Sequence, residues 1–191
     1  GYYGSYCYLP LYVFCGEHLL CARLRQANVG PAEGTVEEIA RIIFQIRERW
    51  PNVKIVIRAD SGFCRDDILS WCEGHGVEYV IGLARNSRLE QMIASEMEQA
   101  RAESQRTGEP YRLYKDLEYQ TRESWSRARR VVGKAEYLID KQNARYVVSS
   151  IPIETIAGQA LYEDEYCGRG DMENRIKEQK CFLFSDRTSA E

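Results

Sequence analysis

The sequence is short of histidine and of long apolar runs, and each shortage excludes a class of protein. The longest apolar stretch, residues 6–15, contains Pro10 and is too short to cross a bilayer. It also lacks a basic leader and a small-residue cleavage site, so we expect no membrane segment, no secretion signal and a cytoplasmic location. Seven cysteines are an odd number, and with no secretion signal they favour free thiols over a disulfide framework. They form no C-x2-C pair, and His18 and His75 are the only histidines, which disfavours a structural zinc site.

Charge of either sign is not in large excess. Lys and Arg number 26 against 29 Asp and Glu, and this net charge of −3 by itself disfavours nucleic-acid binding. The charges are unevenly placed, however, because residues 122–134 carry many basic side chains and a single acidic one, Glu123. A mildly acidic protein of this kind can still present a basic face.

The hydrophobic pattern of the sequence predicts one α/β domain. The chain has 191 residues, of which 44% are apolar, enough to bury a substantial core. The predicted elements of the first half are strands at 6–14 and 19–25, a helix at 35–50, a strand at 53–59, a helix at 66–73 and a strand at 77–83. Thr35 and Glu38 have the spacing of a capping box at the start of the first helix. The succession of strand, helix and strand predicts parallel neighbours in one sheet.

The second half is predicted to hold a β-rich segment between two helices. The expected elements are a helix at 88–105, strands at 111–119, 128–137 and 145–149, and a last long helix from 159 to about 180. We interpret residues 107–150 as an insertion in a core made of residues 1–106 and 151–191, so that residues 1–191 form a single domain.

The first candidate for chemistry is Asp60. This carboxylate follows the β-branched strand at 53–59 directly, and open α/β sheets bind their ligands at the carboxyl ends of strands. Ser61 and Gly62 allow a sharp turn there. The alternative is that Asp60 only caps a turn or the next helix.

The second candidate is the run Tyr166-x2-Arg169-x3-Glu173-x6-Lys180. On a continuous α-helix these offsets would place the four side chains within an arc of about 60°. A phenol, a guanidinium, a carboxylate and an ammonium group on one face suit a metal-assisted phosphate site. The alternative is a solvated helix with ion pairs such as Arg169 with Glu173.

The amino-acid sequence around these candidates is similar to that of a known family. Residues 58–67 (RADSGFCRDD), 124–134 (SWSRARRVVGK) and 162–180 (YEDEYCGRGDMENRIKEQK) resemble DDE transposases of bacterial insertion sequences with the Tyr-Arg-Glu-Lys signature. The resemblance extends over essentially the whole chain and points to the thirteen-eighty insertion-sequence family in particular.

The resemblance implies a ribonuclease-H-like core in which three acidic residues bind two Mg²⁺ ions. Asp60 matches the second acid and Glu173 the third, whereas no Asp precedes Asp60 in this chain. Tyr166, Arg169 and Lys180 match the rest of the signature and would position DNA. We therefore expect an incomplete core that lacks its first strand, that is, a truncated and inactive fragment of a bacterial, nucleoid-associated transposase that works at least as a homodimer on DNA.

The β-rich insertion precedes the last catalytic helix and supplies further candidates for DNA contact, namely Trp125, Arg127, Arg129 and Arg130. The arginines would contact phosphates and the indole would stack on an unpaired base. The alternative is a buried Trp125 with the arginines at a solvated strand edge. Two other functions stay open for the whole chain: a non-catalytic DNA-binding remnant, and a metal-dependent nuclease or phosphatase on the same core.

Overall fold

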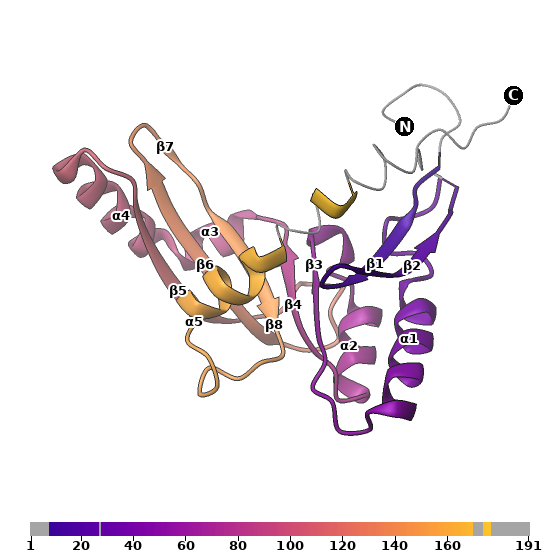
Figure 1. The fold of residues 1–191 in the computed structure, drawn as a ribbon. Coiled ribbons are helices and arrows are strands. Elements are labelled where there is room, and N and C mark those ends of the chain that lie inside the picture. Colours follow the sequence, from indigo (N-terminus) through magenta and orange to yellow (C-terminus); the bar gives the residue numbers. More distant parts are fainter. Residues whose placement is uncertain (1–7, 27, 170–173, 177–191) are drawn as a thin grey trace, which may run out of the picture. The chain divides into compact units, whose positions relative to one another are not determined.

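The computed structural model describes residues 8–26, 28–169 and 174–176 of the chain (Figure 1). It is a mixed α/β protein that divides into two compact units, residues 1–53 with 168–191, and residues 54–167. Among the described residues, no helix is long and apolar enough to cross a membrane.

The first unit contains a hairpin and one amphipathic helix. Strands β1 (Leu11–Cys15) and β2 (His18–Arg23) pair antiparallel, which confirms the predicted hairpin, although β1 begins at Leu11 and is shorter than the predicted strand 6–14. Gly16 turns the chain between them with φ 56°, a left-handed conformation that glycine adopts without strain. Helix α1 (Thr35–Arg49) buries an isoleucine stripe, as its periodicity predicts.

The predicted capping box at the start of α1 is wrong. Gly34, with φ 71°, is the N-cap, and Thr35 is already the first helical residue. Because Thr35 is the first helical residue and not the N-cap, its hydroxyl forms no capping hydrogen bond with the N–H groups of the first turn. Glu38 instead accepts hydrogen bonds from Arg41 at 3.0 Å and from Arg23 at 3.3 Å.

The second unit is built on a mixed sheet in the order β3-β4-β8-β6-β5 (Figure 1). Its strands are β3 (Val56–Ala59), β4 (Glu78–Leu83), β5 (Tyr111–Tyr119), β6 (Arg129–Leu138) and β8 (Arg145–Ser149), with the short β7 (Lys141–Gln142) paired to the end of β6. β3 and β4 are parallel and are joined through the turn η1 (Ser61–Phe63) and helix α2 (Asp66–Gly74), which confirms the predicted parallel pair. The other pairings are antiparallel.

The strands of the predicted insertion continue this sheet. β8 pairs with β4, and β6 pairs with both β8 and β5. The centre of the sheet is fully buried, with Val131 and Val132 of β6 opposite Val147 and Val148 of β8. Runs of β-branched residues are typical of strands buried on both faces, and the sequence therefore indicated these strands correctly.

The single helix predicted at 88–105 is interrupted. The structure has α3 (Ser87–Met92), capped by the Asn86 side chain, and α4 (Ala94–Thr107), separated by Ile93 at φ −112° and ψ 16°. Ile93 is fully buried and packs over Gly133 of β6, where a Cβ would lie 2.8 Å from its Cγ2. This tertiary contact, rather than a local signal, breaks the helix.

The last helix is also not a continuous α-helix over the part that the structure describes. It begins as α5 (Gly158–Ala160), widens into the π-helical turn η2 (Leu161–Tyr166) and tightens into the 3₁₀ turn η3 (Cys167–Arg169). Leu161 and Tyr162 are buried in a cluster with Val80, Val132 and Val147 of the sheet. Burial of these two adjacent side chains favours the wider turn, so the arc calculated for an α-helix does not apply between Tyr166 and Arg169.

Candidate active site

Asp60 lies where the sequence predicted, directly after β3 at the carboxyl end of the parallel pair. Its Oδ1 accepts a hydrogen bond of 2.8 Å from the backbone N–H of Gly62 and so caps the turn η1. The side chain is exposed, and its Oδ2 accepts no hydrogen bond from the residues that the structure describes. The capping alternative is therefore observed, and it leaves one carboxylate oxygen for a ligand.

Tyr166 lies beside the Asp60 turn although it comes from the other end of the unit. A Cβ built on Gly82 of β4 would be 2.6 Å from the Tyr166 hydroxyl, 3.0 Å from Ser61 N and 3.4 Å from Asp60 C. The space beside Gly82, near the end of β4, is thus bordered by both the Tyr166 hydroxyl and the Asp60 turn. The fold brings together Asp60 and the first residue of the Tyr-Arg-Glu-Lys signature.

The backbone and ring of Tyr166 are held from two sides. Arg58 of β3 donates a hydrogen bond of 3.1 Å from Nη1 to the carbonyl of Glu165. The Tyr166 ring lies 5.5 Å from that of Tyr162, and Tyr162 lies 5.6 Å from Tyr114 of β5. Such tilted ring pairs stabilise each other beyond their burial alone.

The Tyr162 ring also receives a cation. Lys134 Nζ lies 5.3 Å from its centroid and forms an ion pair of 2.7 Å with Glu136. Burial raises the pKa of Glu136, but the hydrogen bonds from Lys134 and Asn143 outweigh burial and lower its pKa overall. The Lys134 side chain therefore lies in the interior, where it contacts Glu136 and the Tyr162 ring of η2.

The remaining signature residues are only partly described. Arg169 ends η3, and Glu173 and Lys180 lie outside the described residues. Within the described part of the chain, no group of three or more His, Cys, Asp or Glu side chains is arranged to hold a metal ion. Asp60 alone fits one hard oxygen ligand of the kind that Mg²⁺ prefers.

Arg129, predicted to contact DNA, lies in the protein interior. Its side chain is 2% exposed and forms ion pairs of 2.7 Å with Asp66 and 2.8 Å with Glu73, both on α2. Its guanidinium also lies 5.4 Å from the ring of Trp125, which is itself buried as the alternative held. A phosphate could bind Arg129 only after these carboxylates had released it.

Arg130 is similarly occupied. It donates hydrogen bonds to Asp116 at 2.7 Å and to the carbonyls of Ile151 at 2.7 Å and Ile156 at 2.9 Å. These bonds hold residues 151–156, the connection from β8 to α5. The arginines at 129 and 130 thus serve as internal anchors in this structure, and DNA contact by them stays a prediction.

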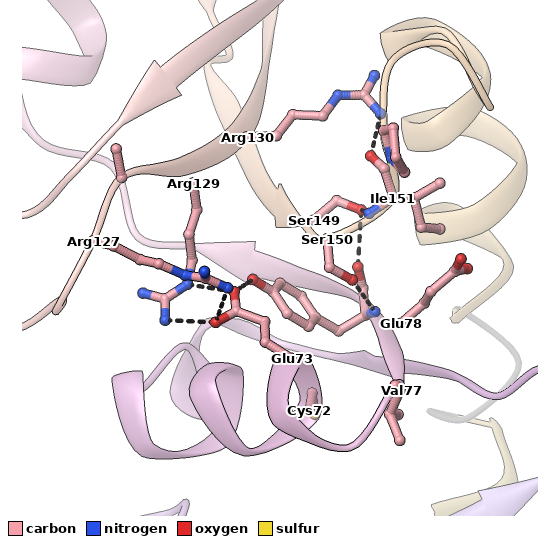
Figure 2. Close-up of a pocket in the computed structure, with 14 residues that line it drawn as sticks. Cys72, Glu73, Val77, Glu78, Arg127, Arg129, Arg130, Ser149, Ser150 and Ile151 are labelled. Atoms are coloured by element: carbon pink, nitrogen blue, oxygen red, sulfur yellow. Dashed lines mark hydrogen bonds and ion pairs between the residues drawn. The ribbon is translucent and has the colours of Figure 1, made fainter.

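Arg127 is the more accessible member of the predicted basic group. Its side chain is 59% exposed and pairs with Glu73 at 2.6 Å. Figure 2 shows Arg127 and Arg129 converging on this carboxylate at the wall of an open groove of about 520 Å³. The groove lies at the start of β4 and the end of β8, whereas Asp60 follows the opposite end of the β3–β4 pair.

The electrostatics of this cluster follow from its geometry. Burial raises the pKa of Glu73 and of Asp66, but hydrogen bonds from Arg129 and its neighbours lower both pKa values overall. Burial and the bond to Glu73 raise the pKa of Tyr79, which donates to that carboxylate at 2.7 Å. The cluster is therefore a network of ion pairs between Arg129 and the two carboxylates, to which Tyr79 contributes a hydrogen bond as a neutral phenol.

Sequence reasoning did not single out Arg58 or Gly82. Arg58 precedes Asp60 by two residues, and side chains at this spacing share one face of a strand. Gly82 interrupts the apolar strand 77–83, and a glycine within a strand marks a close approach by another group. Both signals are present in the sequence.

The family model described as Transposase DDE domain group 1 matches residues 1–191. No curated protein matches the chain.

Proposed function

Because the chain belongs to the group 1 family of DDE transposase domains, we propose that it is the DNA-processing part of an insertion-sequence transposase of the thirteen-eighty family. The observation that carries the proposal is the placement of Tyr166 against the Asp60 turn. A family-typical acid and the first residue of the Tyr-Arg-Glu-Lys signature thereby share one end of a mixed α/β sheet. The fold supports a ribonuclease-H-like core, with residues 107–150 as its β-rich insertion.

In this proposal Asp60 and Glu173 hold two Mg²⁺ ions. When bound, such a pair of ions activates a water molecule on one side of a phosphodiester and stabilises the leaving 3′ oxygen on the other. Asp60 is exposed, and its Oδ1 accepts the Gly62 N–H, so we assign this role to its Oδ2. Arg169 would grip a phosphate oxygen with parallel hydrogen bonds, while Tyr166 and Lys180 position the DNA end.

We further propose that these 191 residues alone bind DNA without cutting it. The sequence has no Asp before Asp60, so one of the three acids of the family is absent from it. β3 is also an edge strand of the described sheet, with β4 as its partner on one side. The proposed partners are transposon-end and target DNA, which would place the protein at the bacterial nucleoid, and a second copy of the chain on DNA.

Fluorescence anisotropy with a labelled duplex from the repeat that flanks the gene tests this function. We expect binding that weakens as salt rises and that falls in Arg169→Ala and Lys180→Ala, because lost phosphate contacts reduce affinity. Arg106→Ala is the matched control, since this exposed arginine on α4 pairs with Glu103. Absence of a complex at low salt would overturn DNA binding, and efficient Mg²⁺-dependent nicking would overturn the proposed inactivity.

Flanking sequence separates this function from the nuclease alternative. A transposase gene lies between short inverted repeats, whereas a housekeeping nuclease or phosphatase gene does not. Repeats on both sides of the gene are therefore expected.

A further inference from the structure

Arg58 and Asp60 project from the same face of β3. Arg58 lies opposite Val80 in the parallel pair with β4, and Asp60 continues the strand in an extended conformation, at φ −80° and ψ −179°. Side chains two residues apart on an extended segment point to one face. The Arg58 side chain thus lies on the same face of the sheet as the exposed Asp60 carboxylate.

Within the described residues, the Arg58 side chain donates one hydrogen bond, and this bond leads to the signature segment. Its Nη1 donates to the carbonyl of Glu165, the residue before Tyr166, at 3.1 Å. That carbonyl belongs to a π-helical turn, where the backbone geometry is less regular than in an α-helix. Arg58 therefore ties the backbone of this turn to β3, the strand that directly precedes Asp60.

Gly82 fixes the other end of the tyrosine. The hydroxyl of Tyr166 occupies the space in which a side chain at position 82 would begin, at 2.6 Å from an ideal Cβ. Even the smallest side chain would therefore displace the hydroxyl or the backbone at Ser61, which lies 3.0 Å from the same point. The backbone of Gly82 is at negative φ, so the glycine is required by space rather than by conformation.

We propose that Arg58 and Gly82 are positioning residues that together fix Tyr166 beside Asp60. Arg58 holds the tyrosine backbone through the Glu165 carbonyl, and Gly82 leaves room for the hydroxyl. The inference rests on the proposed function in one respect, namely that Tyr166 and Asp60 serve the same DNA site. The contacts themselves are independent of that function.

The placement of Tyr166 is tested with 3-fluorotyrosine introduced at position 166 of the full chain and observed by ¹⁹F NMR. Arg58→Ala and Gly82→Ala are each expected to shift the resonance, because each changes the surroundings of the ring. Arg65→Ala is the matched control, since the Arg65 side chain is exposed and its one ion pair among the described residues, with Asp67, is long at 3.8 Å. Circular dichroism melting identifies variants that do not fold, and the exposed Arg58 keeps the test decisive if Gly82→Ala fails to fold.

A double-mutant cycle on DNA affinity tests the consequence for binding, again with the duplex from the flanking repeat. Arg58→Ala is expected to weaken binding about fivefold in the parent chain. The same change is expected to have little effect in the Tyr166→Ala background, because a positioning residue acts through the residue that it positions.

The two measurements separate the failure of each idea. An unshifted resonance in folded Arg58→Ala overturns the positioning role. A shifted resonance with equal losses of affinity in both backgrounds would make Arg58 an independent DNA contact and also overturn it. A shifted resonance in a chain that binds no DNA upholds the placement of Tyr166 and contradicts the proposed function instead.

Discussion

At the scale of single residues, buried charges divide the basic segment into groups with different roles. Arg129 is nearly inaccessible and is bonded by two carboxylates, whereas Arg127 on the same segment is largely exposed. Removal of one partner from a buried ion pair leaves an uncompensated charge, which is far more costly than the loss of an exposed pair. Position along the sequence does not distinguish these two arginines, but their burial does.

Arg129→Met is accordingly expected to destabilise the fold by about 3–5 kcal/mol, since it removes the buried guanidinium that pairs with both Asp66 and Glu73. Arg127→Ala, the matched control, is expected to cost about 0–1 kcal/mol. Urea denaturation of the two variants measures both values. Equal stability losses would show that Arg129 is not an internal anchor.

The same cluster makes stability depend on pH in the acidic range. The pKa values of Asp66 and Glu73 are lower in the folded protein than in the unfolded chain. The stabilisation is therefore complete above the ordinary carboxyl pKa of about 4 and is lost as pH falls through the lowered folded values. Melting temperatures measured from pH 7 down to pH 3 should fall less steeply in Arg129→Met than in the parent chain. Parallel curves for the two proteins would argue against this linkage.

At the scale of elements, long-range packing decides where helices break. Ile93 separates α3 from α4 because its side chain fills the space over Gly133 of β6. Gly133 is distant in sequence, so the helical pattern of residues 88–105 carries no sign of the break. Leu161 and Tyr162 act similarly on the last helix, where their burial against the sheet accompanies the π-helical turn.

Gly133→Ala is expected to destabilise the protein by about 1–3 kcal/mol, because the new methyl group would lie 2.8 Å from Ile93 and 3.3 Å from Tyr146. Ile93→Leu, whose side chain lacks the Cγ2 branch, should recover part of the loss in the double variant. Gly74→Ala at the end of α2 is the control of opposite sign, since open space surrounds that position and alanine favours helix. Chemical denaturation of the three variants decides the point, and a neutral Gly133→Ala would refute the packing account.

At the scale of the whole molecule, the elements that show a local hydrophobic pattern could be predicted from the sequence. The β-branched runs indicated strands such as β6 and β8, and the strand that precedes Asp60 was correctly expected to have a parallel neighbour. Features that depend on distant partners were not readable, such as the carboxylates on α2 that bind Arg129. The contact of Tyr166 with the Asp60 turn also depends on Gly82, a residue from a third element.

Binding of Mn²⁺ in place of Mg²⁺ tests the central claim most directly, because it probes the acids of the proposed transposase site without requiring cleavage. Electron paramagnetic resonance of free Mn²⁺, titrated with the full chain, gives the affinity. The account predicts weak binding that is reduced in Asp60→Asn and in Glu173→Gln, and unchanged in the control Asp67→Asn, an exposed acid on α2. Equal binding by all four proteins, or no binding by the parent chain, would contradict the assignment of Asp60 and Glu173 as metal ligands.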